Sequence, residues 1–263
     1  MGFDISYHPI KEEEIQEWYF RALDNQSHVE KLIAESGMQD FYADKYKNTL
    51  SIGKETPDTE VFDKTHGFYI AIVQGFFRKY FYTRGSAFSF LMEQFPLFKD
   101  YTKSWQEIIP GIKNPANNKI TENYCSGVYI PADEVVKLLR GYMGSKNINE
   151  ILTEFYSHQR LSVFINALKF AEENNMGLLE ATEVVEPNPL DLNNSKSYSN
   201  LFNCDTEGAL LYQETAMEQI REIERQNNLP EGEISKNAEY TKTDVNETEQ
   251  KEKKGFWKKL FGK

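Results

Sequence analysis

Histidine is the side chain best suited to acid–base chemistry near neutral pH, and this chain has four. His8 follows Asp4 by four positions at the end of a segment with strand character, so both would lie on one face of a strand. His66 stands near Asp63 in a segment with helical spacing. No histidine has a metal-binding spacing such as HExxH, so no metal site is expected. We take Asp4, His8 and His66 as candidate polar residues, with helix capping and core packing as the competing interpretation.

Arg84 opens the sequence Arg84-Gly85-Ser86, which follows a long aromatic segment. If this turn begins a helix, its backbone N–H groups could hold an anion, while a plain turn is the competing interpretation. The two cysteines, Cys125 and Cys204, form no CxxC pair, so neither a disulfide framework nor a zinc site is predicted. The GxSxG, GxGxxG and Walker A motifs are absent, and no cofactor is expected.

A catalytic function would therefore need residues that are dispersed along the sequence. Paired carboxylates that hydrolyse glycosidic bonds leave no local pattern, and the 41 Asp and Glu residues offer no basis for choosing a pair. Residues 185–205 show no periodicity, and irregular segments of this length are often functional. The alternative hypothesis is thus an enzyme, such as a hydrolase, with active-site residues around His8 or His66 and the 185–205 segment.

The last nine residues, GFWKKLFGK, contain the clearest binding signal in the chain. On a helix their aromatic and leucine side chains would occupy one arc of about 140°, with lysines on the other side. Residues 251–263 carry six lysines and one glutamate. Such a segment fits an anionic membrane surface, a groove on another protein or the acidic part of its own chain. The candidate membrane- or partner-binding residues are Lys253, Lys254, Phe256, Trp257, Lys258, Lys259, Leu260 and Phe261.

The chain as a whole is acidic, with a formal net charge of −11 at pH 7. An acidic body repels phosphate backbones, so no nucleic acid is expected as a partner. It would attract a basic protein instead, and inhibition of a basic enzyme or toxin is one form of such an interaction. No apolar run is long enough to cross a membrane and no secretory signal is visible. We expect a cytoplasmic protein with peripheral association at the inner membrane face.

A mainly helical framework must position these residues. Strand character in residues 3–7 and in 120–130 predicts two strands that pair with each other or a local hairpin. Helical spacing and capping residues predict helices over 57–82, from 131 to Gly141, over 147–177 as one or two helices, and from Thr206 to about 226. Ser27 and Gly37 are predicted to start and end an earlier helix.

The predicted fold is α+β and mainly α, with one helical globular domain over residues 1–226 and a small element of two or three strands. Residues 227–250 hold few large apolar side chains, which predicts a flexible acidic linker. Residues 251–263 form a basic amphipathic tail. Because no catalytic motif is present, we expect a non-enzymatic interaction protein whose tail docks reversibly on a membrane surface or a partner.

Overall fold

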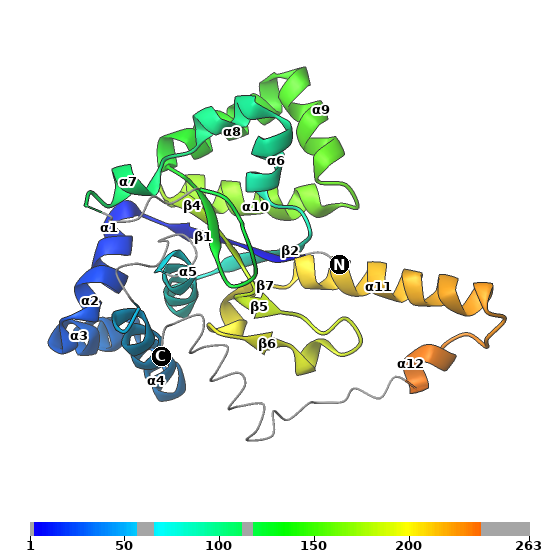
Figure 1. The fold of residues 1–263 in the computed structure, drawn as a ribbon, viewed down its shortest axis with the longest axis horizontal. Helices are drawn as coiled ribbons and strands as arrows, with labels where there is room; N and C mark the ends of the chain where they lie inside the picture. Colours follow the sequence, from blue (N-terminus) through cyan, green and yellow to red (C-terminus); the bar gives the residue numbers. More distant parts are fainter. Residues whose placement is uncertain (1–2, 57–65, 112–117, 238–263) are drawn as a thin grey trace.

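A five-stranded sheet forms the centre of the molecule (Figure 1). The computed structural model describes residues 3–56, 66–111 and 118–237. The strand order is β3-β4-β1-β2-β7, with antiparallel pairs except for the parallel pair β2–β7, and β5 pairs with β6 in a separate small sheet. The strands are β1 (Asp4–Ile10), β2 (Tyr80–Arg84), β3 (Ser126–Ile130), β4 (Gly177–Thr182), β5 (Val185–Glu186), β6 (Lys196–Ser197) and β7 (Cys204–Asp205).

Strand β1 lies between β4 and β2, and all of its residues are buried. The register pairs Asp4 with Arg84 at one end and Tyr7 with Glu180 towards the middle. Because successive side chains of a strand point to opposite faces, His8 faces one layer of helices and Tyr7 faces the other. The sheet therefore separates two groups of buried polar side chains.

Helices cover both faces of this sheet (Figure 1). On one face lies α5 (His66–Phe77), and on the other lie α8 (Ala132–Gly144) and α10 (Arg160–Glu173). Each face has its own hydrophobic core, because the central strands are buried on both sides. The other helical segments are α1 (Glu12–Ile15), η1 (Gln16–Phe20), α2 (Arg21–Leu23), α3 (Gln26–Ser36), α4 (Asp40–Lys54), α6 (Phe88–Gln94), η2 (Pro96–Tyr101), α7 (Trp105–Ile108), α9 (Lys146–Phe155), η3 (Leu192–Asn194), η4 (Leu201–Asn203), α11 (Glu207–Gln226) and α12 (Glu233–Asn237).

Two sequence predictions placed helix where the structure has strand. The helix expected over 57–82 is described from His66 and ends at Phe77, and Tyr80–Arg84 is strand β2; residues 57–65 lie outside the described ranges. Aromatic and β-branched side chains favour strands, but an apolar run buried on all sides has no period that separates the two structures. The segment 147–177 divides into α9 and α10, and β4 begins at its last residue, Gly177.

The fold class is confirmed: the described chain is α+β and mainly helical, although its sheet is larger than the two or three strands expected. The N-terminal strand, the helix end at Gly37 and the helix start after Thr206 also agree with the predictions. The helix expected to start at Ser27 is capped by Asn25 instead, and the helix expected to end at Gly141 continues to Gly144. Strand β3 pairs with β4, not with β1. None of the helices in the described ranges has the length and apolar character needed to cross a bilayer.

Candidate functional site

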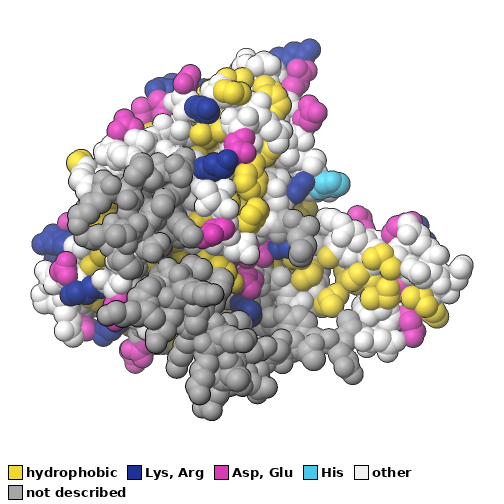
Figure 2. Space-filling view, viewed as in Figure 1, with side chains coloured by type: hydrophobic (Ala, Val, Ile, Leu, Met, Phe, Trp, Pro, Cys, Tyr) yellow, Lys and Arg dark blue, Asp and Glu magenta, His cyan; other side chains and the backbone are white. Residues whose placement is uncertain are grey.

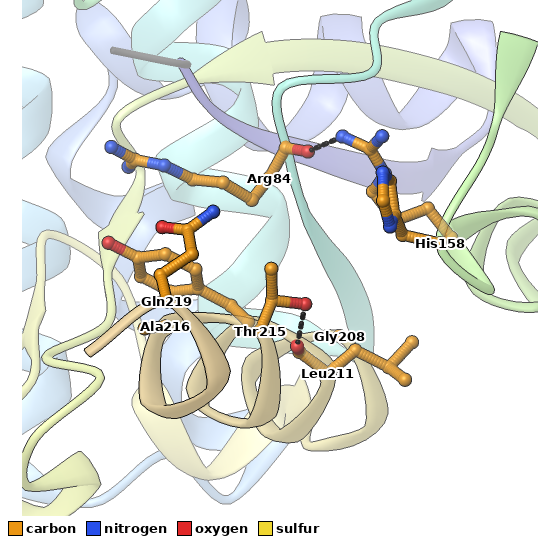
Figure 3. Close-up of a pocket in the computed structure, with 9 residues that line it drawn as sticks. Arg84, His158, Gly208, Leu211, Thr215, Ala216 and Gln219 are labelled. Carbon is orange, nitrogen blue, oxygen red and sulfur yellow. Dashed lines mark hydrogen bonds between the residues drawn. The ribbon is translucent and has the colours of Figure 1, made fainter. Parts of the chain in front are cut away.

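A cleft opens where the end of β2, the start of α10 and one side of α11 meet (Figure 3). Its volume of about 420 Å³ lies in the range of small-ligand sites. Basic side chains come from β2 and from the start of α10, and apolar or neutral side chains come from α11. The lining residues are Arg84, His158, Arg160, Gly208, Leu211, Tyr212, Thr215, Ala216 and Gln219. None of these described lining residues is acidic, although the chain has a net charge of −11.

Arg84, the last residue of β2, is held from two sides. Its Nη1 forms an ion pair with the carboxylate of Asp4, its partner across the strand pair. Its guanidinium lies 4.9 Å from the centre of the Tyr212 ring, a cation–π contact. Partial burial acts to lower the pKa of Arg84, but the hydrogen bond and charge of Asp4 outweigh it and the pKa is raised overall. Two of the predicted polar residues, Asp4 and Arg84, thus pair with each other, and Arg84 lines the cleft while Asp4 lies buried behind it.

Arg160 is the first residue of α10 and also lines the cleft. Its Nη1 donates to the Arg84 carbonyl at 2.7 Å, its Nε to the Ser157 carbonyl at 2.8 Å, and its Nη2 to Ser157 Oγ at 2.9 Å. These bonds leave one N–H on each terminal nitrogen for a further acceptor. Burial lowers the pKa of Arg160, although a guanidinium stays ionised near neutral pH. The preceding residues, His158 and Gln159, have φ values of 57° and 63°, a left-handed conformation that is uncommon outside glycine.

Helix α11 reaches the sheet closely enough to form the facing wall because a glycine lies in its first turn. A Cβ atom at Gly208 would lie 1.7 Å from the carbonyl oxygen of Tyr82, far inside contact distance. The next turns carry the apolar lining residues Leu211 and Ala216. The hydroxyl of Thr215 donates to the Leu211 carbonyl at 2.9 Å, so it is engaged by the helix backbone (Figure 3). This wall offers shape and apolar surface together with the aromatic ring of Tyr212.

A second carboxylate stands behind Asp4. Glu183 Oε1 accepts a hydrogen bond of 3.2 Å from the Asp4 backbone N–H, and the Glu183 N–H donates to the Asp4 carbonyl at 2.7 Å. Burial, followed by the charge of Asp4, raises the pKa of Glu183 to about 7. Near neutral pH this carboxyl is therefore partly protonated, and Asp4 is the main negative charge that Arg84 meets.

His8, another predicted polar residue, lies apart from the cleft in the core. It is fully buried and stacks on Tyr80 with 5.0 Å between ring centroids. Its Nδ1 lies 2.7 Å from Gln74 Oε1 and its Nε2 lies 2.8 Å from Ser6 Oγ. The Gln74 amide nitrogen donates to two carbonyls, so its oxygen is the acceptor and His8 Nδ1 carries the proton. Burial lowers the pKa of His8 to about 4, which keeps the ring neutral near pH 7.

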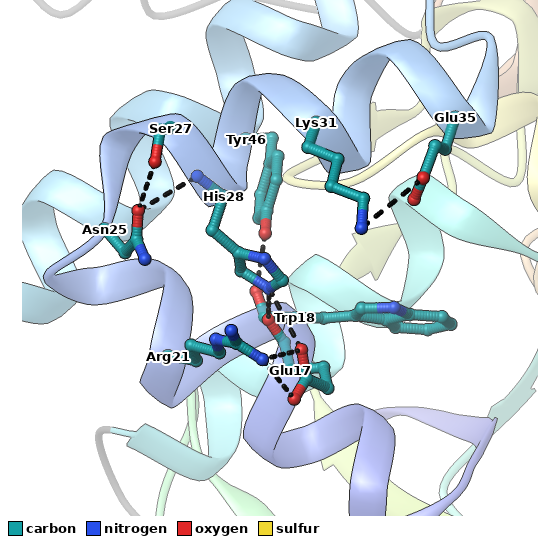
Figure 4. Close-up of polar contacts among 9 residues, drawn as sticks. All are labelled: Glu17, Trp18, Arg21, Asn25, Ser27, His28, Lys31, Glu35 and Tyr46. Atoms are coloured by element: carbon teal, nitrogen blue, oxygen red, sulfur yellow. Dashed lines mark hydrogen bonds and ion pairs between the residues drawn. The ribbon is translucent and has the colours of Figure 1, made fainter.

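The remaining histidines near the N-terminal helices serve contacts between helices. His66 Nδ1, at the start of α5, lies 2.7 Å from the hydroxyl of Tyr19. His28 Nε2 lies 2.9 Å from the Glu17 carbonyl oxygen and 3.2 Å from its carboxylate (Figure 4). The same carboxylate pairs with Arg21 at 3.0 Å. These contacts join α3 and α5 to the first helices, and His66 is not brought near Asp4, His8 or Arg84.

A buried carboxylate lies on the other face of the sheet. Glu180 in β4 accepts hydrogen bonds from the backbone N–H groups of Phe88 and Ser89, the first residues of α6. In the same core the hydroxyls of Tyr7 and Tyr156 lie 2.9 Å apart. Burial raises the pKa of Glu180 to about 7. Its hydrogen bonds fasten α6 to the sheet.

Sequence reasoning identified Asp4 and Arg84 but missed His158 and Arg160. The polar run SHQR from Ser157 was a signal, because it interrupts the apolar spacing between two helices. The candidate tail residues Lys253, Lys254, Phe256, Trp257, Lys258, Lys259, Leu260 and Phe261 lie outside the described residues. Segment 185–205 forms short strands and turns, and none of its described residues lines the cleft.

The arrangement favours binding over catalysis. It joins two guanidinium groups with a helix wall that carries the hydroxyls of Tyr212 and Thr215, and the Thr215 hydroxyl is already hydrogen bonded. Over residues 3–56, 66–111 and 118–237, no group of three or more His, Cys, Asp or Glu side chains is placed to hold a metal ion. Comparison with known proteins found no matching family model, no matching curated protein and no matching solved structure.

Proposed function

We propose that this protein is a non-enzymatic interaction protein whose C-terminal segment, residues 251–263, docks reversibly on an anionic membrane surface. The observation that carries the proposal is the course of α11, which leads the chain away from the body (Figure 1). The described chain ends at Asn237, after α12, and residues 238–250 connect this point to the basic segment along the sequence.

The projection begins about halfway along α11. The first half packs on the body, where Ala209 and Tyr212 join the apolar cluster of β2 and Gln213 donates to the Pro189 carbonyl at 3.2 Å. We call residues 217–237 the arm; its main packing is between α11 and α12. Ile223 is 48% exposed and Leu229 is 41% exposed, and Figure 2 shows hydrophobic side chains gathered where the arm projects. Such exposure of apolar side chains suits a region that meets another surface.

Projection matters because the body and the target surface are both negative. A helix of 20 residues is about 30 Å long, so its second half extends about 15 Å beyond the body. Electrostatic repulsion falls off over a Debye length of about 10 Å at 0.1 M salt. Repulsion between the acidic body and an anionic surface is therefore reduced at the far end of α11, from which the chain leads on towards the basic segment.

The segment itself has the composition for weak membrane binding. Each lysine near an anionic surface contributes on the order of 1 kcal/mol, and residues 251–263 carry six lysines against one glutamate. Burial of its aromatic side chains adds an apolar contribution. Association should therefore be reversible and sensitive to salt. A hydrolase around His8 or His66 has less support, since His8 is buried as a neutral ring and His66 is hydrogen bonded to Tyr19.

Co-sedimentation with phosphatidylcholine vesicles that contain phosphatidylserine tests the proposal. The full chain should pellet with these vesicles, and a chain that ends at Gln250 should not. A variant with Phe256→Ala and Trp257→Ala should bind weakly, while Tyr240→Ala, which removes an aromatic side chain ahead of the basic segment, should bind like the wild type. Equal pelleting of full and shortened chains would refute membrane docking. Capture of one protein by the full chain but not by the shortened one, without vesicle binding, would replace the membrane with a protein groove.

A further inference from the structure

The cleft at α11 has the charge and shape of a site for an organic anion, a function separate from that of the C-terminal segment. We propose that it binds a small organic molecule that carries a phosphate or carboxylate group. The oxyanion would lie against Arg160 at the start of α10, and the organic part would lie along α11, whose lining residues Leu211, Ala216 and Gln219 are shown in Figure 3.

Arg160 carries the proposal furthest. Its three described hydrogen bonds go to carbonyl and hydroxyl oxygens, which are neutral, and no carboxylate within the described ranges pairs with it. A half-buried cation without a counter-charge is costly. The same bonds fix the plane of the guanidinium, so its remaining N–H groups are already oriented when an oxyanion arrives. Phosphate and carboxylate are the acceptors whose geometry matches this group.

The second guanidinium makes the cleft selective for charge. The Arg84 side chain also lines the cleft, and its backbone carbonyl is the acceptor that orients Arg160. Asp4 neutralises Arg84 in part, but Asp4 is buried behind the strand end and does not line the cleft. The described charged or titratable basic groups that line the cavity are Arg84, Arg160 and His158, and each of them carries a positive charge when ionised. A cationic ligand would therefore be repelled.

The size and apolar wall select an organic molecule over a bare ion. The cavity of about 420 Å³ exceeds the space that one phosphate group needs. Leu211 and Ala216 provide apolar surface for the remainder of the ligand, and the Gln219 side chain can orient one polar substituent. An aromatic or aliphatic group attached to the oxyanion would therefore bind more tightly than the oxyanion alone.

Titration calorimetry of the full chain with phenyl phosphate, benzoate and benzyl alcohol tests this site. Phenyl phosphate or benzoate should bind with a salt-sensitive affinity, and neutral benzyl alcohol should not. Preference for phenyl phosphate identifies a phosphate ligand, and preference for benzoate identifies a carboxylate ligand. Arg160→Met should weaken the preferred probe by about 10-fold or more, since a hydrogen bond to a charged group is lost. The matched control is Arg140→Met on the exposed surface of α8, which should bind like the wild type.

Two further results separate ligand binding from damage to the fold. Arg160→Lys keeps the positive charge but loses the planar pair of N–H donors of the guanidinium. Its affinity for the preferred probe should therefore lie between those of the wild type and Arg160→Met. Ala216→Phe narrows the cleft from the α11 side without changing its charge. It should weaken the binding of phenyl phosphate more than the binding of inorganic phosphate. The proposal is overturned if neither organic anion binds at about 10 mM, or if Arg160→Met binds as tightly as Arg140→Met.

Discussion

Replacing Glu180 with glutamine removes a carboxyl group that burial keeps protonated at a pH where an exposed glutamate would be ionised. The pKa of Glu180 is raised from 4.5 to about 7 by burial. Between these values the folded chain holds one proton more than the unfolded chain, so this group's contribution to stability is full below pH 4.5 and is lost as the pH rises through 7. A shift of this size corresponds to about 3 kcal/mol at 1.36 kcal/mol per pKa unit. Relative to the wild type, Glu180→Gln should gain about this much unfolding free energy between pH 4.5 and 7.

His8 gives the opposite sign in nearly the same pH range. Burial lowers its pKa from 6.5 to about 4, so the unfolded chain holds the extra proton between these values. Its contribution is present above pH 6.5 and is lost as the pH falls through 4. His8→Asn keeps a donor towards Gln74 Oε1 but does not titrate. Relative to the wild type, it should lose about 3 kcal/mol of unfolding free energy as the pH rises from 4 to 6.5.

Urea unfolding at half-unit steps from pH 4 to 8 measures both effects, with the free energy extrapolated to water at each step. Packing changes caused by either substitution shift the whole curve and leave its pH dependence intact, so the slopes are diagnostic. The difference curves of the two variants against the wild type should run in opposite directions. Difference curves that are flat, or that slope the same way, would refute the assignment of buried, uncharged forms to Glu180 and His8 near pH 6.

Two further substitutions test how α11 is seated and how it ends. Gly208→Ala places a Cβ atom 1.7 Å from the Tyr82 carbonyl oxygen, and should destabilise the fold by about 1–3 kcal/mol and lower the melting temperature by about 2–12 °C. Gly144→Ala, where a Cβ would meet nothing within 4 Å, should be neutral or slightly stabilising, so equal melting temperatures for the pair would contradict the close approach. Glu224 accepts hydrogen bonds from the backbone N–H groups of Gly232 and Ile234 at 2.9 and 2.8 Å. Glu224→Ala should therefore speed amide exchange at Ile234 by about 5–30-fold, and unchanged exchange would show that α12 does not depend on this carboxylate.

Elements with local signals could be predicted from the sequence. Alternating side chains mark β1, Gly37 supplies the left-handed residue that ends α3, and Thr206 precedes the apolar spacing of α11. Strand β2 lacks such a signal because it is buried and follows the apolar run of α5, and β4 lacks it because its polar residues Glu180 and Thr182 are buried as well as its apolar ones. For β4 the preceding helical spacing also concealed the change of structure at Gly177.

The candidate site was harder to predict because its parts come from three distant segments. Arg84, Arg160 and Tyr212 meet only after β2, α10 and α11 have packed. Asp4 and Arg84 were singled out separately, and their pairing depends on the register of β1 with β2. Histidines attracted attention as candidate bases, yet His8 is an uncharged part of the core. Residue type alone does not distinguish a buried structural histidine from a reactive one.

The close approach of Gly208 to β2, together with the packing of Ala209 and Tyr212, fixes the direction in which α11 leaves the sheet. Gly208 lies near the start of α11, where this helix contacts β2. One side of the first half of the helix forms the cleft wall, and its C-terminal end leads on to α12. Because α11 is about 30 Å long, a tilt of about 10° at its start would move its far end by about 5 Å. A ligand that tilted α11 would therefore move α12 by a similar distance. By thermodynamic reciprocity, a partner whose binding at the far end tilted α11 would alter the affinity of the cleft for its ligand.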